Sequence, residues 1–193
     1  MIERNPNEEL PAIHKTAYVH PTAVIIGQVR IGKRVFVGPG AVIRADEPGS
    51  SIIIHDNCNV QDRVVIHALE KTSVIVEEST SLSHGCIIHG PCKIGRNCFV
   101  GFGSVVFKAE INEGTVIKHL TVAEGIKISS NKLVTNGTVI DSEDMIKQLA
   151  PATEKLKTFS QKVVRTNLDL VKAYKKEEIA EKAAGKNENI CHQ

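Results

Sequence analysis

The stretch CKIGRNCFVGFGSVV at residues 92–106 decides the fold of this chain. Within it an aliphatic residue recurs at every sixth position, at Ile94, Val100 and Val106, and a small residue stands two places before each of them. This period fits neither an amphipathic helix, which repeats every ~3.6 residues, nor the simple alternation of a hairpin strand. It fits the hexapeptide repeat, in which each repeat forms one short strand of a parallel β-helix.

The two columns of this repeat extend along most of the chain. The aliphatic column contains Val19, Ile25, Ile31, Val37, Ile43, Ile54, Val60, Ile66, Val76, Leu82, Ile88, Ile94, Val100 and Val106. The second column contains Ala17, Ala23, Val29, Val35, Ala41, Ile52, Cys58, Val64, Val74, Thr80, Cys86, Cys92, Cys98 and Ser104. If both columns point inward, three strands complete a coil of roughly 18 residues, and coils stack at ~4.8 Å by parallel hydrogen bonding. The sequence therefore predicts an all-β solenoid over residues 1–140.

The repeat loses its phase at two places. The spacing from Ile43 to Ile54 is one residue short of two repeats. The spacing from Ile66 to Val76 carries four extra residues, which predicts a small loop over residues 69–73. Loops on a solenoid often carry function, so this loop is a candidate part of a site.

Residues 141–193 carry a helical pattern and form a second predicted segment. Ser142, followed by Glu143 and Asp144, is typical of a helix start. From Thr153 onward, apolar residues recur at helical spacing on one face, at Leu156, Phe159, Val163, Leu170, Val171 and Tyr174. We expect a C-terminal α-helix packed along the solenoid and a frayed polar tail over residues 183–193.

Composition and charge exclude several classes of protein. The formal net charge is +2, and the 193 residues include five Phe, two Tyr and no Trp, so a nucleic-acid partner is not expected. The first residues lack the pattern of a signal peptide, and no apolar run approaches the ~20 residues that span a bilayer. We therefore expect a cytoplasmic protein without a membrane segment. An odd number of cysteines argues against a disulfide framework, and the four in the small column are interpreted as buried free thiols.

Three of the histidines are candidate metal ligands. His67 and His89 each follow an inward aliphatic residue on the same face of adjacent coils, so their side chains should point outward one strand spacing apart. Two imidazoles so placed can reach one ion at ~2.0–2.1 Å. His84 falls at the corner before this face, so its side chain should diverge from those of His67 and His89. A third ligand to the same ion would more easily come from a neighbouring subunit of a threefold assembly. The remaining histidines are interpreted as solvated surface residues: His14, His20, His55, His119 and His192.

Polar residues that the repeat does not require gather at the same edge of the predicted prism. Arg44 and Gln61 are expected to stack outward on adjacent coils, because each follows an aliphatic residue assigned to one face. Asp62 falls on the corner one coil before His84. We interpret Arg44 and Asp62 first as an interface ion pair, ahead of a direct chemical role.

Four motifs in this order resemble the gamma-class carbonic anhydrases: R-x-D-E at 44–47, N-V-Q-D at 59–62, H-A-L-E at 67–70 and H-x-x-x-x-H at 84–89. The resemblance covers residues 12–125, with a weaker match through the C-terminal helix. It implies a left-handed parallel β-helix and a homotrimer with three active sites. Each site would use His67 and His89 of one chain and His84 of the next, and Arg44 and Asp46 would help to hold the subunit interface.

The resemblance also implies roles for four residues around the metal. Gln61 would hydrogen-bond the metal-bound hydroxide, and Glu47 would be the active-site acid that passes the proton onward. Glu70 would be the outer shuttle residue, and Asn167 matches an asparagine that family members place beside the substrate. The long acidic loop that follows the second glutamate in the best-known members is reduced here to residues 71–73.

The activity implied is reversible, metal-dependent hydration of carbon dioxide to bicarbonate. Zinc is the expected cofactor by ligand type, although three imidazoles and a water also suit ferrous iron or cobalt. One alternative is a hexapeptide acyltransferase, which would use one histidine as a general base and bind coenzyme A between prisms. The other is a scaffold or assembly subunit that keeps the fold but lacks turnover.

Overall fold

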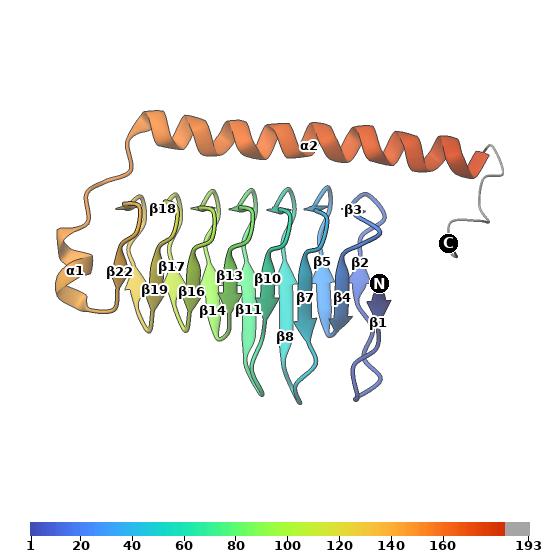
Figure 1. Ribbon diagram of the computed structural model, residues 1–193, viewed down its shortest axis with the longest axis horizontal. Helices are drawn as coiled ribbons and strands as arrows, with labels where there is room; N and C mark the ends of the chain where they lie inside the picture. Colours follow the sequence, from blue (N-terminus) through green and yellow to red (C-terminus); the bar gives the residue numbers. More distant parts are fainter. Residues whose placement is uncertain (184–193) are drawn as a thin grey trace.

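The computed structural model describes residues 1–183, and these form a parallel β-solenoid followed by two helices (Figure 1). Three parallel sheets of eight, seven and seven strands make up the faces of this described solenoid. We call them sheets A, B and C. Consecutive strands belong to different sheets, so each strand pairs with the strand one coil earlier and one coil later. The predicted all-β solenoid is confirmed.

Each sheet takes every third strand of the chain. Sheet A contains β1 (Ile2–Glu3), β4 (Val24–Gly27), β7 (Val42–Ala45), β10 (Val65–His67), β13 (Ile87–His89), β16 (Val105–Phe107), β19 (Val122–Glu124) and β22 (Val139–Ile140). Sheet B contains β2 (Ala12–Ile13), β5 (Val29–Ile31), β8 (Ser51–Ile54), β11 (Ser73–Val76), β14 (Cys92–Ile94), β17 (Glu110–Ile111) and β20 (Lys127–Ile128). Sheet C contains β3 (Tyr18–Val19), β6 (Phe36–Val37), β9 (Asn59–Val60), β12 (Ser81–Leu82), β15 (Phe99–Val100), β18 (Val116–Ile117) and β21 (Leu133–Val134).

The core of the solenoid consists of the two inward columns. In sheet A, for example, Ile25, Ile43, Ile66 and Ile88 stack in register and are completely buried. β-Branched side chains suit these short strands because they pack well on a pleated surface. The cysteines of the small column are free and buried as predicted, and burial raises the pKa of each of three thiols to about 12: Cys58, Cys86 and Cys98.

The first phase break is an insertion after one repeat. The interpretation of the spacing from Ile43 to Ile54 as two repeats less one residue was therefore wrong. Strand β7 lies in sheet A and β8 in sheet B, which means that Ile43 and Ile54 are one repeat apart, with extra residues between them. The added loop spans residues 46–50. The second insertion, over residues 68–72, follows β10 at the same corner one coil later. Figure 1 shows both loops protruding from the same side of the solenoid.

The C-terminal segment contains α1 (Glu143–Gln148) and α2 (Glu154–Ala183). Helix α2 runs back along the solenoid and contacts sheet C at β3, β6, β12 and β18 (Figure 1). Its buried face includes Val171 and Tyr174, whose ring stacks on Tyr18 at 4.4 Å between centroids. Two residues of the predicted face are more exposed than expected, Phe159 and Leu170.

The helical segment begins where the sequence predicts. The residue before α1 is Ser142, as predicted, although its side chain makes no capping hydrogen bond. The expected frayed tail lies outside the described residues except for its first member, Ala183. None of the helices within residues 1–183 has the length and apolar character that crossing a membrane requires.

Candidate functional site

His67 and His89 form the centre of the candidate site. They occupy the last positions of β10 and β13, which pair in parallel, so their side chains point outward from sheet A on adjacent coils. Nδ1 of His67 lies 3.0 Å from Nε2 of His89, and the rings meet edge to face with centroids 4.9 Å apart. The stacked pair that the repeat register predicted is therefore present.

The two rings have the properties of a partial metal site. Nitrogens bound to one ion at ~2.0–2.1 Å each can be at most ~4 Å apart, and the 3.0 Å separation satisfies this limit. The outer nitrogens, His67 Nε2 and His89 Nδ1, are buried and have no hydrogen-bond partner. Burial, followed by the neighbouring Arg44 and His89, lowers the pKa of His67, which favours the neutral imidazole that metal ions bind. The donor set fits a metal ion, although it is incomplete.

Two carboxylates face the same ring. His67 Nε2 lies 3.4 Å from Asp46 Oδ1 and 3.5 Å from Glu47 Oε1. Asp46 also accepts a hydrogen bond from Arg44 at 3.0 Å through its other oxygen, and its Oδ1 is buried without a hydrogen-bond partner. Carboxylates beside a ligating histidine commonly fix its orientation and raise its basicity. Asp46 and Glu47 reach this position because they begin the loop that follows β7.

His84 lies apart from this pair. It occupies the turn between β12 and β13, whereas His89 ends β13, and five residues of extended chain cover up to roughly 16 Å. His84 Nδ1 lies 3.4 Å from Asp62 Oδ2, and about half of its side chain is exposed. Within residues 1–183, no three His, Cys, Asp or Glu side chains are grouped so that they could hold a metal ion. The described chain thus brings His67 and His89 together and leaves His84 at the opposite edge of sheet A.

The prediction that Arg44 stacks beside Gln61 is wrong. Arg44 pairs in register with His67 on sheet A, because the insertion at 46–50 places Ile43 on that face. Gln61 instead follows β9 of sheet C at the corner shared with Asp62. Gln61 is buried, and its amide donates a 2.9 Å hydrogen bond to Asn59 Oδ1.

Asn59 and Asn167 complete the polar groups near sheet C. The Asn59 amide donates to Ser81 Oγ at 2.8 Å, so Gln61 is held by a buried polar chain in which Asn59, the first residue of the N-V-Q-D motif, is the link to Ser81. Asn167 is buried in α2 and donates to the carbonyl oxygen of Val163 at 2.9 Å. The described contacts of Asn167 are therefore within its own helix rather than with the histidines.

Glu70 contacts the site through its backbone. Its N–H donates a 2.6 Å hydrogen bond to Oε2 of Glu47, whereas its carboxylate forms an exposed ion pair with Lys71 at 2.8 Å. The side chain expected to act as an outer shuttle thus lies on the solvent side of the loop.

An outward row of β-branched residues also crosses sheet A and was not recognised from the sequence. We call this row the outward ridge, and its members pair in register from coil to coil: Val42, Val65, Ile87, Val105, Val122 and Val139. Ile87 and Val139 are exposed, with 38% and 52% of their surface accessible. The available signal was an aliphatic residue directly before each inward residue of this one face. The ridge lies on the face that carries His67 and His89.

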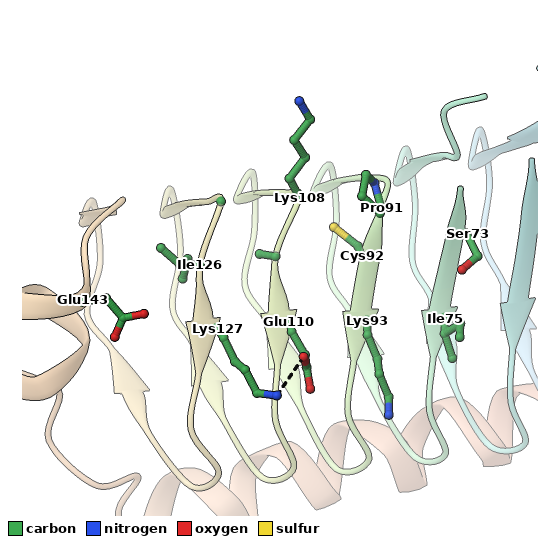
Figure 2. A pocket seen from close by; sticks show the side chains of 12 residues that line it. Ser73, Ile75, Pro91, Cys92, Lys93, Lys108, Glu110, Ile126, Lys127 and Glu143 are labelled. Carbon is green, nitrogen blue, oxygen red and sulfur yellow. Dashed lines mark ion pairs between the residues drawn. The ribbon is translucent and has the colours of Figure 1, made fainter. Parts of the chain in front are cut away.

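A separate groove lies over sheet B, on a different face from the histidines. Figure 2 shows its charged residues along β14, β17 and β20. Lys127 pairs with Glu110 at 3.0 Å, and Lys93 pairs with Glu77 at 3.1 Å. Three of the charged residues that line the groove are therefore already paired, and the other two, Lys108 and Glu143, carry opposite charges.

The fold and the site together define a hexapeptide-repeat β-helix protein that carries an outward histidine pair. The family model "Bacterial transferase hexapeptide (six repeats)" matches residues 11–45 and 73–108. A carbonic anhydrase from Methanosarcina thermophila is 33% identical over 192 residues, covering 89% of this chain and 77% of that protein. The chain belongs to the gamma-class carbonic anhydrase family, and its solenoid is the left-handed hexapeptide β-helix that the resemblance implied.

Two further proteins are similar to this chain. The carboxysome assembly protein CcmM from Nostoc sp. is 36% identical over 172 residues. The match covers 84% of this chain but only 31% of that longer protein. A hexapeptide transferase family protein from Anaplasma phagocytophilum has a solved structure with a TM-score of 0.77 at 26% identity, covering 90% of this chain and 98% of that one. Proteins of different function therefore share this architecture.

Proposed function

We propose that the chain is a metal-dependent carbonic anhydrase that hydrates carbon dioxide reversibly to bicarbonate and a proton. The observation that carries the proposal is the histidine pair, with His67 Nδ1 and His89 Nε2 at 3.0 Å and the outer nitrogen of each ring buried without a hydrogen-bond partner. The family relationship to a carbonic anhydrase over 77% of that enzyme supports the same activity.

Zinc is the proposed ion, with ferrous iron or cobalt as ions of suitable ligand preference. His67 and His89 of one chain and His84 of the next would hold it. A bound zinc ion lowers the pKa of a water from ~15.7 to ~7, a figure known for a carbonic anhydrase of another class, and so supplies hydroxide at neutral pH. An open coordination position beside three histidines is what this chemistry requires.

The surrounding side chains have proposed roles in orientation and proton transfer. Asp46 holds the His67 ring, and Arg44 holds Asp46 through their 3.0 Å contact. Gln61 presents its amide oxygen to the reacting hydroxide because its amide nitrogen is engaged by Asn59. Glu47 accepts the proton released from water, and Asn167 of α2 would contact carbon dioxide or bicarbonate. Carboxylates within reach of the reacting water suit this general acid–base task.

A homotrimer is part of the proposal, because the third ligand must come from another chain. His84 lies across sheet A from the pair, at the edge where a neighbour would approach. The outward ridge supplies an apolar surface for that contact, and its occupant would be a second copy of the chain. Asp62, 3.4 Å from His84, would orient this ligand within the interface.

The test is a stopped-flow carbon dioxide hydration assay after reconstitution with zinc, ferrous iron or cobalt in turn. We expect hydration well above the buffer rate with at least one metal, and loss of this rate in His67→Ala. His55→Ala is the control, since His55 is exposed on the end of sheet B. A wild-type rate equal to buffer with all three metals would contradict the proposal.

Two other activities follow from the relatives and are outcomes of the same experiments. An assembly role like that named for CcmM, in a protein that keeps the metal site, would give metal binding without hydration. An acyltransferase role, for which the transferase family named for the Anaplasma phagocytophilum protein is a precedent only at the level of group transfer, would give no stoichiometric metal. Metal analysis and the hydration assay together therefore separate the three functions.

A further inference from the structure

The loops after β7 and β10 are stacked copies of one turn. In the first, the Ser50 N–H donates to the Glu47 carbonyl at 3.0 Å, and in the second the Thr72 N–H donates to the Leu69 carbonyl at 3.1 Å. The hydroxyls of Ser50 and Thr72 each bond the same carbonyl as their own N–H. The two turns therefore share one hydrogen-bond pattern on adjacent coils.

The third residue of each turn has a left-handed backbone. Gly49 has φ +68° and Lys71 has φ +53°, as a type II turn requires at this position. The turns pack directly on one another, because the Lys71 N–H donates to the Pro48 carbonyl at 2.9 Å. We call the turn after β7 the lower turn and the turn after β10 the upper turn. Pro48 occupies the second position of the lower turn, where proline is favoured, and Glu70 occupies the same position of the upper turn.

The two turns differ in one backbone N–H group. Proline has no N–H, so the lower turn has no donor at its second position, whereas the upper turn has the Glu70 N–H. That N–H donates to Glu47 Oε2 at 2.6 Å, and the other oxygen of Glu47 lies 3.5 Å from His67 Nε2. One carboxylate therefore joins the upper turn to the histidine pair.

We propose that Glu70 is a positioning residue that acts through its main-chain N–H and holds the Glu47 carboxylate toward His67. The Glu70 carboxylate has a different partner, Lys71, and is more than half exposed. The shortened loop thus fixes the inner carboxylate rather than supplying a second one. This inference rests on the proposed function for its catalytic consequence, but the contact itself can be tested without activity.

The chain offers a matched pair of variants. Glu70→Ala removes the carboxylate and keeps the N–H, whereas Glu70→Pro removes both. Proline suits the turn because Pro48 occupies the equivalent position one coil earlier. We expect kcat for carbon dioxide hydration in Glu70→Pro to fall about tenfold below that of Glu70→Ala, with kcat/KM changed by less than about twofold, since the lost contact orients a proton acceptor. Circular dichroism and thermal unfolding check that both variants fold.

Equal kcat values in the two variants would overturn the proposal, whether both variants match wild type or both are slower than wild type. Residue-resolved amide hydrogen exchange tests the contact independently of turnover. The Glu70 amide should exchange slowly in wild type and Glu47→Gln, which keeps an acceptor oxygen, and at least about tenfold faster in Glu47→Ala. Exchange that is insensitive to Glu47→Ala would overturn the positioning contact, whereas absent hydration with sensitive exchange would overturn only the proposed function.

Discussion

Nδ1 of His67 and Nε2 of His89 lie 3.0 Å apart on adjacent coils of sheet A, and the outer nitrogen of each ring is buried without a hydrogen-bond partner. Two inward isoleucines hold this geometry, because Ile66 and Ile88 pair in register directly before the histidines. The position of both rings therefore follows from the packing of the solenoid core.

Removing either ring should empty the proposed metal site. We expect His67→Ala and His89→Ala each to lower bound zinc to under about one tenth of the wild-type content, because the remaining ligands cannot complete a catalytic zinc site. Metal content of the purified, folded proteins measures this. His55→Ala should retain full content, and normal zinc content in either site variant would contradict the assignment.

His119 should make stability depend on pH. Burial, followed by Lys118, lowers its pKa below the ordinary 6.5, and its Nδ1 accepts a hydrogen bond from the Phe102 N–H at 3.0 Å. The unfolded chain therefore binds a proton first as pH falls, so this contribution to stability is present above pH 6.5 and is lost below it. Denaturant unfolding of metal-free protein between pH 5 and 8 should show a smaller decline in His119→Asn than in wild type. Identical declines would exclude this histidine as the cause.

The buried thiols should be unreactive in the folded protein. With a pKa of about 12, Cys58, Cys86 and Cys98 are ionised in roughly one molecule in ten thousand at pH 8, and only thiolates react with disulfide reagents. In a Cys92→Ser and Cys191→Ser background, which leaves these three thiols, we expect labelling by such a reagent only at the rate of unfolding. Rapid labelling of the native protein would show that the small inward column is open to solvent.

Truncation of the core beneath the site should be costly. Ile66→Ala should reduce the free energy of unfolding by about 2–5 kcal/mol, because Ile66 is fully buried and the stacked coils cannot close the cavity. Ile53→Ala serves as a comparison, since Ile53 points outward from β8. Its effect in denaturant unfolding should be clearly smaller, and equal effects would mean that the inward column does not dominate stability.

Much of the fold could be predicted from spacing alone. A period of six specifies which side chains point inward, and it correctly placed His67 and His89 on one face, since the four extra residues between Ile66 and Val76 were recognised as a loop. The period does not specify how the chain turns at a corner. Wherever residues are inserted, the path of the chain at the corner does not follow from the period.

Arg44 shows this limit. The eleven residues from Ile43 to Ile54 can be two repeats less one residue or one repeat plus five, and counting residues does not distinguish them. The structure has the second arrangement, which moves Arg44 onto the face of His67. Pro48 followed by Gly49 is a type II turn signal and could have identified the inserted loop. The backbone contact from Glu70 to Glu47 could not have been predicted, because it depends on how the two turns stack.

Subunit mixing tests the central claim, a site shared between neighbouring chains, most directly. His84→Ala and His89→Ala chains should each bind almost no zinc alone. Refolded together in equal amounts, they should recover about one quarter of the wild-type zinc content and hydration rate, because a quarter of randomly formed interfaces combine an intact pair with an intact His84. A mixture that forms trimers yet binds no more zinc than its parents would contradict the shared site.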